Sequence, residues 1–408
     1  MWCLAYRDWR SYLCDVLRLS ALCKLACLFV CVSASANELR IGFVTTLSTG
    51  AKIVGEDLRD GFLLGLDEIG GKIANFDVKP IIVDDKFSPA VGKEVTQKLL
   101  TEHDVHLVTG FIWSNVLLAS KDLVLDAGRV LISANAGPSK LAGKECHPSF
   151  FNVSFQNGQL PAAIGKIMRA RGYSRAYIMV PDYAAGHDMA AGFARGFSGE
   201  VVGRTATRWT PTPETNFVPV IAKAADAGSD LVFAFYPGKP GVKFFQQFKR
   251  TGSVGQIAVA TSFTIDALLL RGVKKSAEGV WGALTAVHWA PNLENPRNQD
   301  FVRKFRNRFN RMPSFYAAQG FDVVSLIQAA VLNAGGDTID SKKLRDSLKR
   351  VTWPSVRGTV SFGTNNFLRQ NLYLGTVVSG RDGPEMKALE VIERQSVDDY
   401  ASSCALDD

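Results

Sequence analysis

Short apolar runs alternate with amphipathic segments along the chain from residue 39 onward. Residues 39–45 form an apolar, β-branched run, and residues 54–69 then place Leu58, Phe62 and Leu66 on one helical face. The alternation continues through runs that predict strands at 78–83, 105–109 and 130–133 and helices at 89–102 and 115–127. Because these strands are apolar throughout, they are typical of a parallel sheet that is covered on both faces.

A second series of the same kind begins after residue 153. Its expected strands are 175–180, 200–204, 230–235, 256–260 and 279–284. The expected helices between and after them are 160–171, 186–197, 217–227, 242–251, 301–310, 316–333 and 341–350, with closing strands at 359–362 and 372–378. The repetition predicts an α/β protein made of two doubly wound parallel-sheet lobes.

Residues 1–36 have a different character from the rest of the chain. Four basic residues precede a short apolar run at 25–32, and Ala34 and Ala36 stand at the A-x-A spacing of a cleavage site. The run is shorter than the roughly 18–20 apolar residues that a membrane span needs. We therefore expect a signal peptide over 1–36 and export of the mature protein; the alternative is an amphipathic or anchoring first helix.

Export and removal of residues 1–36 would change the number of cysteines in the protein and the redox environment around them. Five of the seven lie within residues 1–36, which leaves Cys146 and Cys404 in the mature chain. An even pair in an oxidising compartment can form a disulfide, and two free buried thiols are the alternative. Lys24 stands where a lipoprotein signal before Cys27 requires leucine, so a soluble periplasmic protein is favoured over a lipoprotein.

The charge and the motifs exclude several classes of function. The formal net charge is +8 for the whole chain and +6 without residues 1–36, and no basic run interleaved with aromatics indicates a nucleic-acid partner. No G-x-S-x-G elbow, P-loop or H-E-x-x-H motif is present, so we expect no enzyme and no cofactor. His103 and His106 lack a third metal ligand and are interpreted as surface residues. Asp84 and Asp85 are interpreted as a solvated turn at a strand end rather than a catalytic dyad.

Candidate binding residues lie in the loops that follow the predicted strands, because open parallel sheets bind ligands beyond the carboxyl ends of their strands. Ser114 stands just before a predicted helix and can either cap that helix or offer its hydroxyl to a ligand carboxylate. Asn135 is a polar group in a second such loop, at 133–138. Aromatic residues in these loops, which can form walls of a pocket or belong to the core, are Trp113, Tyr183, Tyr236 and Phe263.

A series of short strings, in fixed order and spacing, carries a family resemblance. They read IGFVTTLSTG (41–50), GEDLRDGF (55–62), VDDKFSP (83–89), LVTG (107–110), LISANAG (131–137), PDYAAGHD (181–188) and YAAQGFD (316–322). The chain resembles the periplasmic substrate-binding proteins of ABC importers, of the branched-chain amino-acid-binding type. The resemblance extends over about residues 39–404.

The resemblance implies two lobes joined by three crossovers, near Asn152, Thr285 and Leu368. It assigns 37–152 with 286–368 to an N-terminal lobe and 153–285 with 369–408 to a C-terminal lobe. In the family, a serine in the position of Ser114 binds the ligand carboxylate, assisted by the next loop. The expected ligand-binding residues are Ile53, Trp113, Ser114, Asn135, Ala136, Gly137, Tyr183, Ala185, Tyr236, Ser262 and Phe263.

One departure from the family pattern concerns the ligand. Amino-acid binders hold the ligand ammonium with an acidic residue in the loop after the strand near Ala260, but residues 261–264 read Thr-Ser-Phe-Thr. A buried ammonium would lack its partner there, at a cost of several kcal/mol. The sequence is similar to the subgroup that binds aromatic carboxylates, such as benzoate or phenylpropenoate derivatives.

The resulting prediction is a periplasmic, monomeric solute-binding component of an ABC importer that closes on a small carboxylate, an aromatic acid. Its partners would be that ligand and an inner-membrane ABC permease. A binder of branched-chain or other hydrophobic amino acids is one alternative. A ligand sensor of the same fold and a hydrolase are two others.

Overall fold

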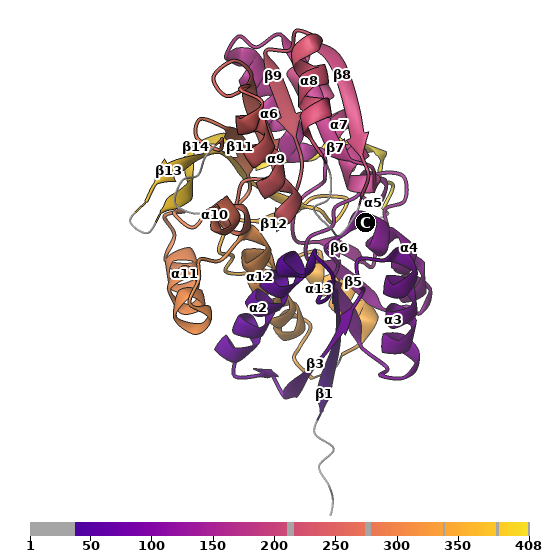
Figure 1. Cartoon of the computed structure of the whole chain (residues 1–408). Coiled ribbons are helices and arrows are strands. Elements are labelled where there is room, and N and C mark those ends of the chain that lie inside the picture. Colours follow the sequence, from indigo (N-terminus) through magenta and orange to yellow (C-terminus); the bar gives the residue numbers. More distant parts are fainter. Residues whose placement is uncertain (1–36, 210–215, 274–278, 338, 381–382, 407–408) are drawn as a thin grey trace, which may run out of the picture. The chain divides into compact units, whose positions relative to one another are not determined.

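Two mostly parallel sheets form the core of the computed structural model, which confirms the predicted α/β class (Figure 1). The structure describes residues 37–209, 216–273, 279–337, 339–380 and 383–406. The predicted signal peptide, 1–36, lies outside the described residues.

The first sheet has six strands, of which all but the short edge strand β2 are parallel. Its spatial order is β2 (Lys72–Ile73), β3 (Phe76–Asp84), β1 (Glu38–Thr45), β4 (Leu107–Gly110), β5 (Val130–Ser133) and β6 (Phe150–Asn152). The strand order reverses at β1, because β3 pairs with one edge of β1 and β4 with the other.

Helices cover this sheet with apolar faces. The first four follow the strands in turn: α2 (Lys52–Glu68), α3 (Pro89–Thr101), α4 (Ser114–Asp126) and the short α5 (Ser139–Ala142). Three more come from far along the chain: α11 (Pro296–Phe309), α12 (Phe315–Asn333) and α13 (Ser341–Leu348). Helix α12 packs against α2 and α13, and its start is fixed by Asp57 of α2, which accepts a hydrogen bond from the backbone N–H of Ser314 (3.0 Å).

The second sheet has eight strands and its own reversal of order, at β7. Its spatial order is β12 (Ser361–Phe362), β13 (Leu368–Ser379), β11 (Leu284–Val287), β10 (Ala258–Ser262), β9 (Leu231–Ala234), β7 (Arg175–Pro181) and β8 (Glu200–Thr207), with β14 (Pro384–Ser396) paired to β13. The accompanying helices are α6 (Gln159–Ala170), α7 (Ala184–Phe197), α8 (Val218–Asp226), α9 (Lys239–Arg250) and α10 (Ala267–Val273), followed by the 3-10 turn η2 (Ala401–Ser403).

One expected strand is wrong in its bounds, and one observed strand was not expected. The strand expected at 279–284 begins only at Leu284, because Gly279 and Gly282 have left-handed backbones (φ +82° and +80°) that an extended strand does not admit. The strand β14 was not expected at all. It pairs antiparallel with β13 and alternates exposed, charged residues such as Glu385 and Lys387 with buried Met386 and Ala388, as a strand with one solvated face does.

Helix α12 is, within the described part of the chain, the one helix long and apolar enough to cross a membrane by length and composition. It lies inside the protein, with 83% of its most apolar window buried. This is the property of a core helix.

The chain passes between the two sheets at three places, and a buried ion pair lies beneath two of them. Asp322 of α12 and Arg357 are both buried, with Oδ2 and Nη2 2.9 Å apart. Arg357 also donates to Oε1 of Gln370 at the start of β13 (3.1 Å), and Gln370 donates to the carbonyl oxygen of Ser154 just after β6. The ion pair therefore supports the backbone of the first and third crossovers.

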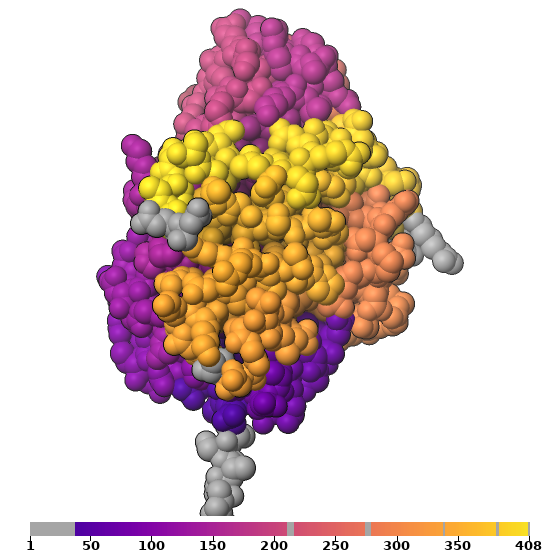
Figure 2. Space-filling model, turned by 180° about the vertical axis from the view of Figure 1, so that it is seen from behind, coloured from indigo at the N-terminus to yellow at the C-terminus, as the bar shows by residue number. Residues whose placement is uncertain are grey.

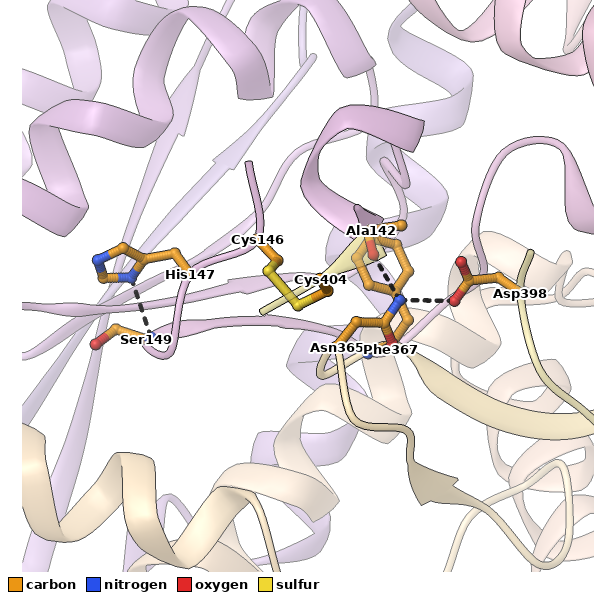
Figure 3. Close-up of a disulfide and its surroundings, with 8 residues drawn as sticks. All are labelled: Ala142, Cys146, His147, Ser149, Asn365, Phe367, Asp398 and Cys404. Carbon is orange, nitrogen blue, oxygen red and sulfur yellow. Dashed lines mark hydrogen bonds between the residues drawn. A yellow bond between two sulfur atoms is a disulfide. The ribbon is translucent and has the colours of Figure 1, made fainter. Parts of the chain in front are cut away.

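A disulfide joins Cys146, after α5, to Cys404, near the C-terminus, which confirms the predicted pairing (Figure 3). Beside it, the amide of Asn365 donates to the carbonyl oxygen of Ala142 and to the carboxylate of Asp398, each at 2.8 Å. The C-terminal residues, yellow in Figure 2, run as a band between the magenta residues of the second sheet and the orange segment that contains α12 and α13. The disulfide fixes the end of this band to the first sheet.

We expect removal of the disulfide, by replacing Cys146 and Cys404 together with serine, to lower the free energy of unfolding by about 2–4 kcal/mol, because the unfolded chain gains freedom. Urea denaturation measures this change. Reductant should lower the stability of the native protein to that of the double variant and leave the variant unchanged. Equal stability of the two proteins under oxidising conditions would contradict the prediction.

Candidate functional site

The two reversals of strand order bring loops together at the carboxyl ends of the strands. In the first sheet the reversal lies between β1 and β4, whose loops begin at Thr46 and Phe111. In the second sheet it lies between β7 and β9, whose loops begin at Asp182 and Phe235. Doubly wound sheets form a ligand crevice at such points, because neighbouring loops there turn to opposite faces of the sheet.

The loop after β4 has a backbone that few residues can adopt. Gly110 has φ +105°, and a Cβ atom there would lie 2.2 Å from the carbonyl oxygen of Val44, so only glycine fits. Phe111 has φ +62°, a left-handed conformation that is strained in a bulky residue. Phe263, in the loop after β10, has a similar φ of +56°. A loop of each sheet therefore contains a phenylalanine with a strained, left-handed backbone at the carboxyl end of a strand.

A cavity of about 20 Å³, room for about one water molecule, lies where these loops meet. Six aromatic rings and three polar, uncharged side chains account for most of its lining. The lining residues are Ile112, Trp113, Ser114, Asn135, Ala136, Phe155, Asn157, Tyr183, Ala185, Met189, Phe235, Pro237, Phe263 and Tyr316. None of these described residues carries a charged side chain. The site suits an apolar molecule with a few polar atoms.

Ser114 is the first residue of α4, and its side chain does not cap the helix. Instead, its hydroxyl oxygen accepts a hydrogen bond from Nδ2 of Asn157 (3.1 Å). Nδ2 of Asn157 also donates to Asp188 of α7 (3.0 Å), whose carboxylate accepts from the backbone N–H of Ser139 of α5 (2.9 Å). This network joins the polar end of the cavity to a helix of each sheet.

Asn135 is held by the donation of its Nδ2 to the carbonyl oxygen of Ile112 (2.8 Å). Its Oδ1 is buried without a hydrogen-bond partner among the described residues. The hydroxyl groups of Tyr183 and Tyr316 have pKa values raised mainly by burial, with further contributions from the carboxylates of Asp188 and Asp266 respectively, so both stay protonated. The cavity thus presents neutral donors and acceptors.

A chain of hydrogen bonds holds Trp113 in the wall. Its indole N–H donates to Oγ1 of Thr46 (2.8 Å), which donates to Oδ1 of Asp85 (2.6 Å). The backbone N–H of Phe87 donates to the same carboxylate oxygen (2.8 Å). Asp85 is fully buried, and burial raises its pKa to about 6. The interpretation of Asp85 as part of a solvated turn is therefore wrong, because its carboxylate is buried and accepts hydrogen bonds from Thr46 and Phe87; Asp84 beside it is partly exposed.

Most of the expected binding residues lie in this cavity. Trp113, Ser114, Asn135, Ala136, Tyr183, Ala185 and Phe263 line it, and Tyr236 lines an adjoining one. Three others do not line either cavity. Ile53 packs on the core beside Gly238, Gly137 allows the close approach of the Phe155 backbone, and Ser262 is buried at the end of β10.

Other lining residues escaped the sequence analysis. Phe155, which stacks on Phe263 with centroids 4.0 Å apart, and Asn157 lie on the first crossover rather than in a strand-end loop. Tyr316 lies in the first turn of α12. It opens the string YAAQGFD (316–322), whose family resemblance was the one sign in the sequence that this residue could belong to the site. The short apolar–polar alternation at 153–157 did not indicate that side chains of this segment line the cavity.

The described residues include no group of three or more His, Cys, Asp or Glu that could hold a metal ion. His106 is half-buried and accepts a hydrogen bond at Nδ1 from the backbone N–H of Arg40 (2.9 Å), so it has a structural partner. Asp266, the acidic residue nearest to the Thr261–Thr264 loop, lines a separate cavity with Arg271 and Trp289. It does not line the aromatic cavity.

Two α/β sheets whose strand-end loops meet around a small, uncharged cavity have the type I periplasmic-binding arrangement, which surrounds a small molecule. The chain belongs to the periplasmic binding protein family, whose model matches residues 38–383.

Known proteins resemble the chain over nearly its full length. A Leu/Ile/Val-binding protein homolog 6 of Brucella suis is 25% identical over 384 residues, which cover 92% of this chain and 97% of the relative. A solute-binding protein of an ABC transporter from R. palustris, in complex with benzoate, is 27% identical with a TM-score of 0.84, covering 91% of this chain and all of that one. Another, from Rhodopseudomonas palustris BisB5 in complex with 3,4-dihydroxybenzoic acid, is 25% identical with a TM-score of 0.80, covering 86% and 96%.

The buried carboxylate of Asp85 predicts a pH dependence of stability. Because burial raises its pKa from 3.8 to about 6, the native state binds this proton more tightly than the unfolded chain does. The stability that results is present below pH 4 and is lost as the pH rises through 6. Relative to Asp85→Asn, we expect native stability to fall by about 2 kcal/mol between pH 4 and pH 7, measured by urea denaturation.

Asp84→Asn is the matched control. Burial acts to raise the pKa of Asp84, but hydrogen bonds from Ser48 and from the N–H groups of Leu47 and Lys86 hold it below 3.8. The stability that Asp84 contributes is lost only as the pH falls below about 4, so relative to Asp84→Asn the native protein should show no loss of stability between pH 4 and pH 7. A difference between the native protein and Asp85→Asn that does not vary with pH would contradict the burial of Asp85.

Proposed function

We propose that the protein is the solute-binding component of an ABC importer and that it closes on an aromatic carboxylic acid. The observation that carries this proposal is the cavity with six aromatic rings, a serine and two asparagines in its lining and no charged lining residue. Aromatic rings and small polar groups match an aryl body and a carboxylate.

Ser114 is the proposed carboxylate ligand. Its hydroxyl lies at the start of α4, where backbone N–H groups and the helix dipole favour an anion. Asn157 now donates to this hydroxyl, so the Ser114 proton remains available to a carboxylate oxygen. Asn135 lines the same cavity, and its Oδ1, which has no hydrogen-bond partner among the described residues, can accept from a ligand hydroxyl.

The cavity lacks the carboxylate that an α-ammonium group requires. Asp188 and Asp266 raise the pKa values of the wall residues Tyr183 and Tyr316, but neither carboxylate lines the cavity. Asp188 already accepts from Asn157 and Ser139. An ammonium group in this cavity would be buried without a partner, which disfavours a free amino acid.

Binding requires the two halves to separate and close again, because a space of about 20 Å³ does not admit an aromatic ring. We propose that the moving parts are the lobes 37–152 with 286–368 and 153–285 with 369–408. The two separate sheets and the packing of α12 on α2 support this division, apart from β12 (361–362), which pairs with β13 of the second sheet. A ligand that contacts Ser114 on one side and Tyr183 on the other favours the closed form.

The remaining parts of the proposal follow from this role. Residues 1–36 act as the signal peptide for export to the periplasm, where Cys146 and Cys404 pair. The closed protein is recognised, as a monomer, by an inner-membrane ABC permease. No cofactor and no covalent chemistry are required, so the protein is not an enzyme.

A binder of branched-chain amino acids is the second candidate, favoured by the name of the Brucella relative. A thermal-shift screen separates the two candidates. We expect benzoate and phenylpropenoate derivatives to raise the melting temperature and leucine, isoleucine and valine to leave it unchanged. Stabilisation by the amino acids alone would overturn the choice of ligand, and stabilisation by neither class would overturn the proposed function.

Ser114→Ala tests the carboxylate site. We expect it to weaken binding of the acid by about 1–3 kcal/mol, the cost of an unmet hydrogen bond to a charged group, as measured by calorimetry. Ser120→Ala is the control, since Ser120 is a buried serine of the same helix that does not line the cavity. An unchanged dissociation constant for Ser114→Ala would remove Ser114 from the site.

A further inference from the structure

A second cavity, of about 40 Å³, adjoins the first. The two share Trp113, Tyr183 and Pro237, which therefore form the partition between them. The other lining residues of the second cavity are Phe87, Pro181, Thr207, Arg208, Trp209, Tyr236 and Pro240. The second cavity, whose lining does not include Ser114, is called the far cavity here, and the first is called the near cavity.

Stacked rings from both sheets enclose the far cavity. Trp209, after β8, stacks on Phe87, after β3, with ring centroids 4.0 Å apart. It also stacks on Tyr183 (5.3 Å) and meets Trp113 edge-on (6.2 Å). Because Phe87 and Trp209 belong to different sheets, this stack forms only when the loops of the two sheets meet. Its apolar faces suit the distal part of an aryl ligand.

Two hydrogen-bond donors lie among these rings. The indole N–H of Trp209 is buried and has no acceptor among the described residues. The hydroxyl of Tyr236 is buried and accepts a hydrogen bond from Thr207 (3.3 Å), which leaves its own proton to donate. Burial raises the pKa of Tyr236, so this proton is retained. Buried donors normally have an acceptor, and here the acceptor can come from a ligand.

We propose that the far cavity is a second subsite, which receives an oxygen-bearing substituent at the end of the ligand opposite its carboxylate. The Trp209 N–H and the Tyr236 hydroxyl donate to that oxygen, while Ser114 holds the carboxylate. The ligand class is then an extended aromatic acid with a distal hydroxyl or ether oxygen. This inference rests on the proposed function, because it takes the near cavity as the carboxylate site.

Calorimetric titration with 3-phenylpropenoic acid and its 4-hydroxy derivative tests the subsite. The native protein should bind the hydroxylated acid about tenfold more tightly, since buried donors discriminate against a ligand without the acceptor. Trp209→Phe and Tyr236→Phe each remove one donor and keep an aromatic ring. Each should reduce this preference to about threefold or less, because the donor that distinguishes the two acids is removed.

Phe87→Leu is the control for ring packing. It removes a stacked ring and no donor, so it should weaken both acids by the same factor and keep their ratio. The ratio of affinities is a readout that general damage to the fold does not change. The use of two donor variants keeps the test valid if one of them fails to fold.

The possible failures are distinguishable. If native protein binds both acids equally, or if the preference survives in both donor variants, the subsite assignment is wrong and the proposed function stands. If no aromatic acid binds the native protein, the proposed function fails and the subsite assignment fails with it.

Discussion

The reversal of strand order in each parallel sheet is the constraint on which the site depends. At β1 and at β7 the chain turns to opposite sides of the sheet, so the loops that follow neighbouring strands diverge and leave room between them. Trp113 and Tyr183 project from these two points, and their rings lie 6.3 Å apart, edge to face. A single sheet provides only half of such a cavity. The aromatic lining is therefore a property of the pair of sheets.

The buried charged side chains are not among the lining residues of the cavity and instead support the crossovers and the cavity wall. Asp322 and Arg357 are paired beneath the crossovers, where the loss of either partner would leave a buried charge uncompensated. Asp85 fixes Trp113 through Thr46 from behind the wall. The cavity itself is lined by neutral groups. The charged pairs thus stabilise the residues behind the cavity, while the neutral lining can contact an apolar ligand.

The sequence predicted the fold well because strands buried on both faces are continuous apolar runs, and the helices between them have a clear period. It predicted Trp113, Ser114 and Tyr183 because they directly follow such strands. It did not predict Phe155, Asn157 and Tyr316, since crossover segments and a distant helix reach the site only through tertiary packing. The burial of Asp85 and the one-sided strand β14 were missed for the same reason: neighbours remote in sequence decide them. The stop before β11 depends on the left-handed glycines at 279 and 282.

The Cys146–Cys404 bond closes a covalent ring across a sequence separation of 258 residues. All three crossovers, both partners of the Asp322–Arg357 pair and the whole second sheet lie inside this ring. A protease that cuts one exposed loop between the two cysteines therefore produces a nicked molecule whose fragments remain tethered, and the halves separate only after reduction. In the periplasmic location proposed above, the ring would keep the molecule in one piece after a single cleavage.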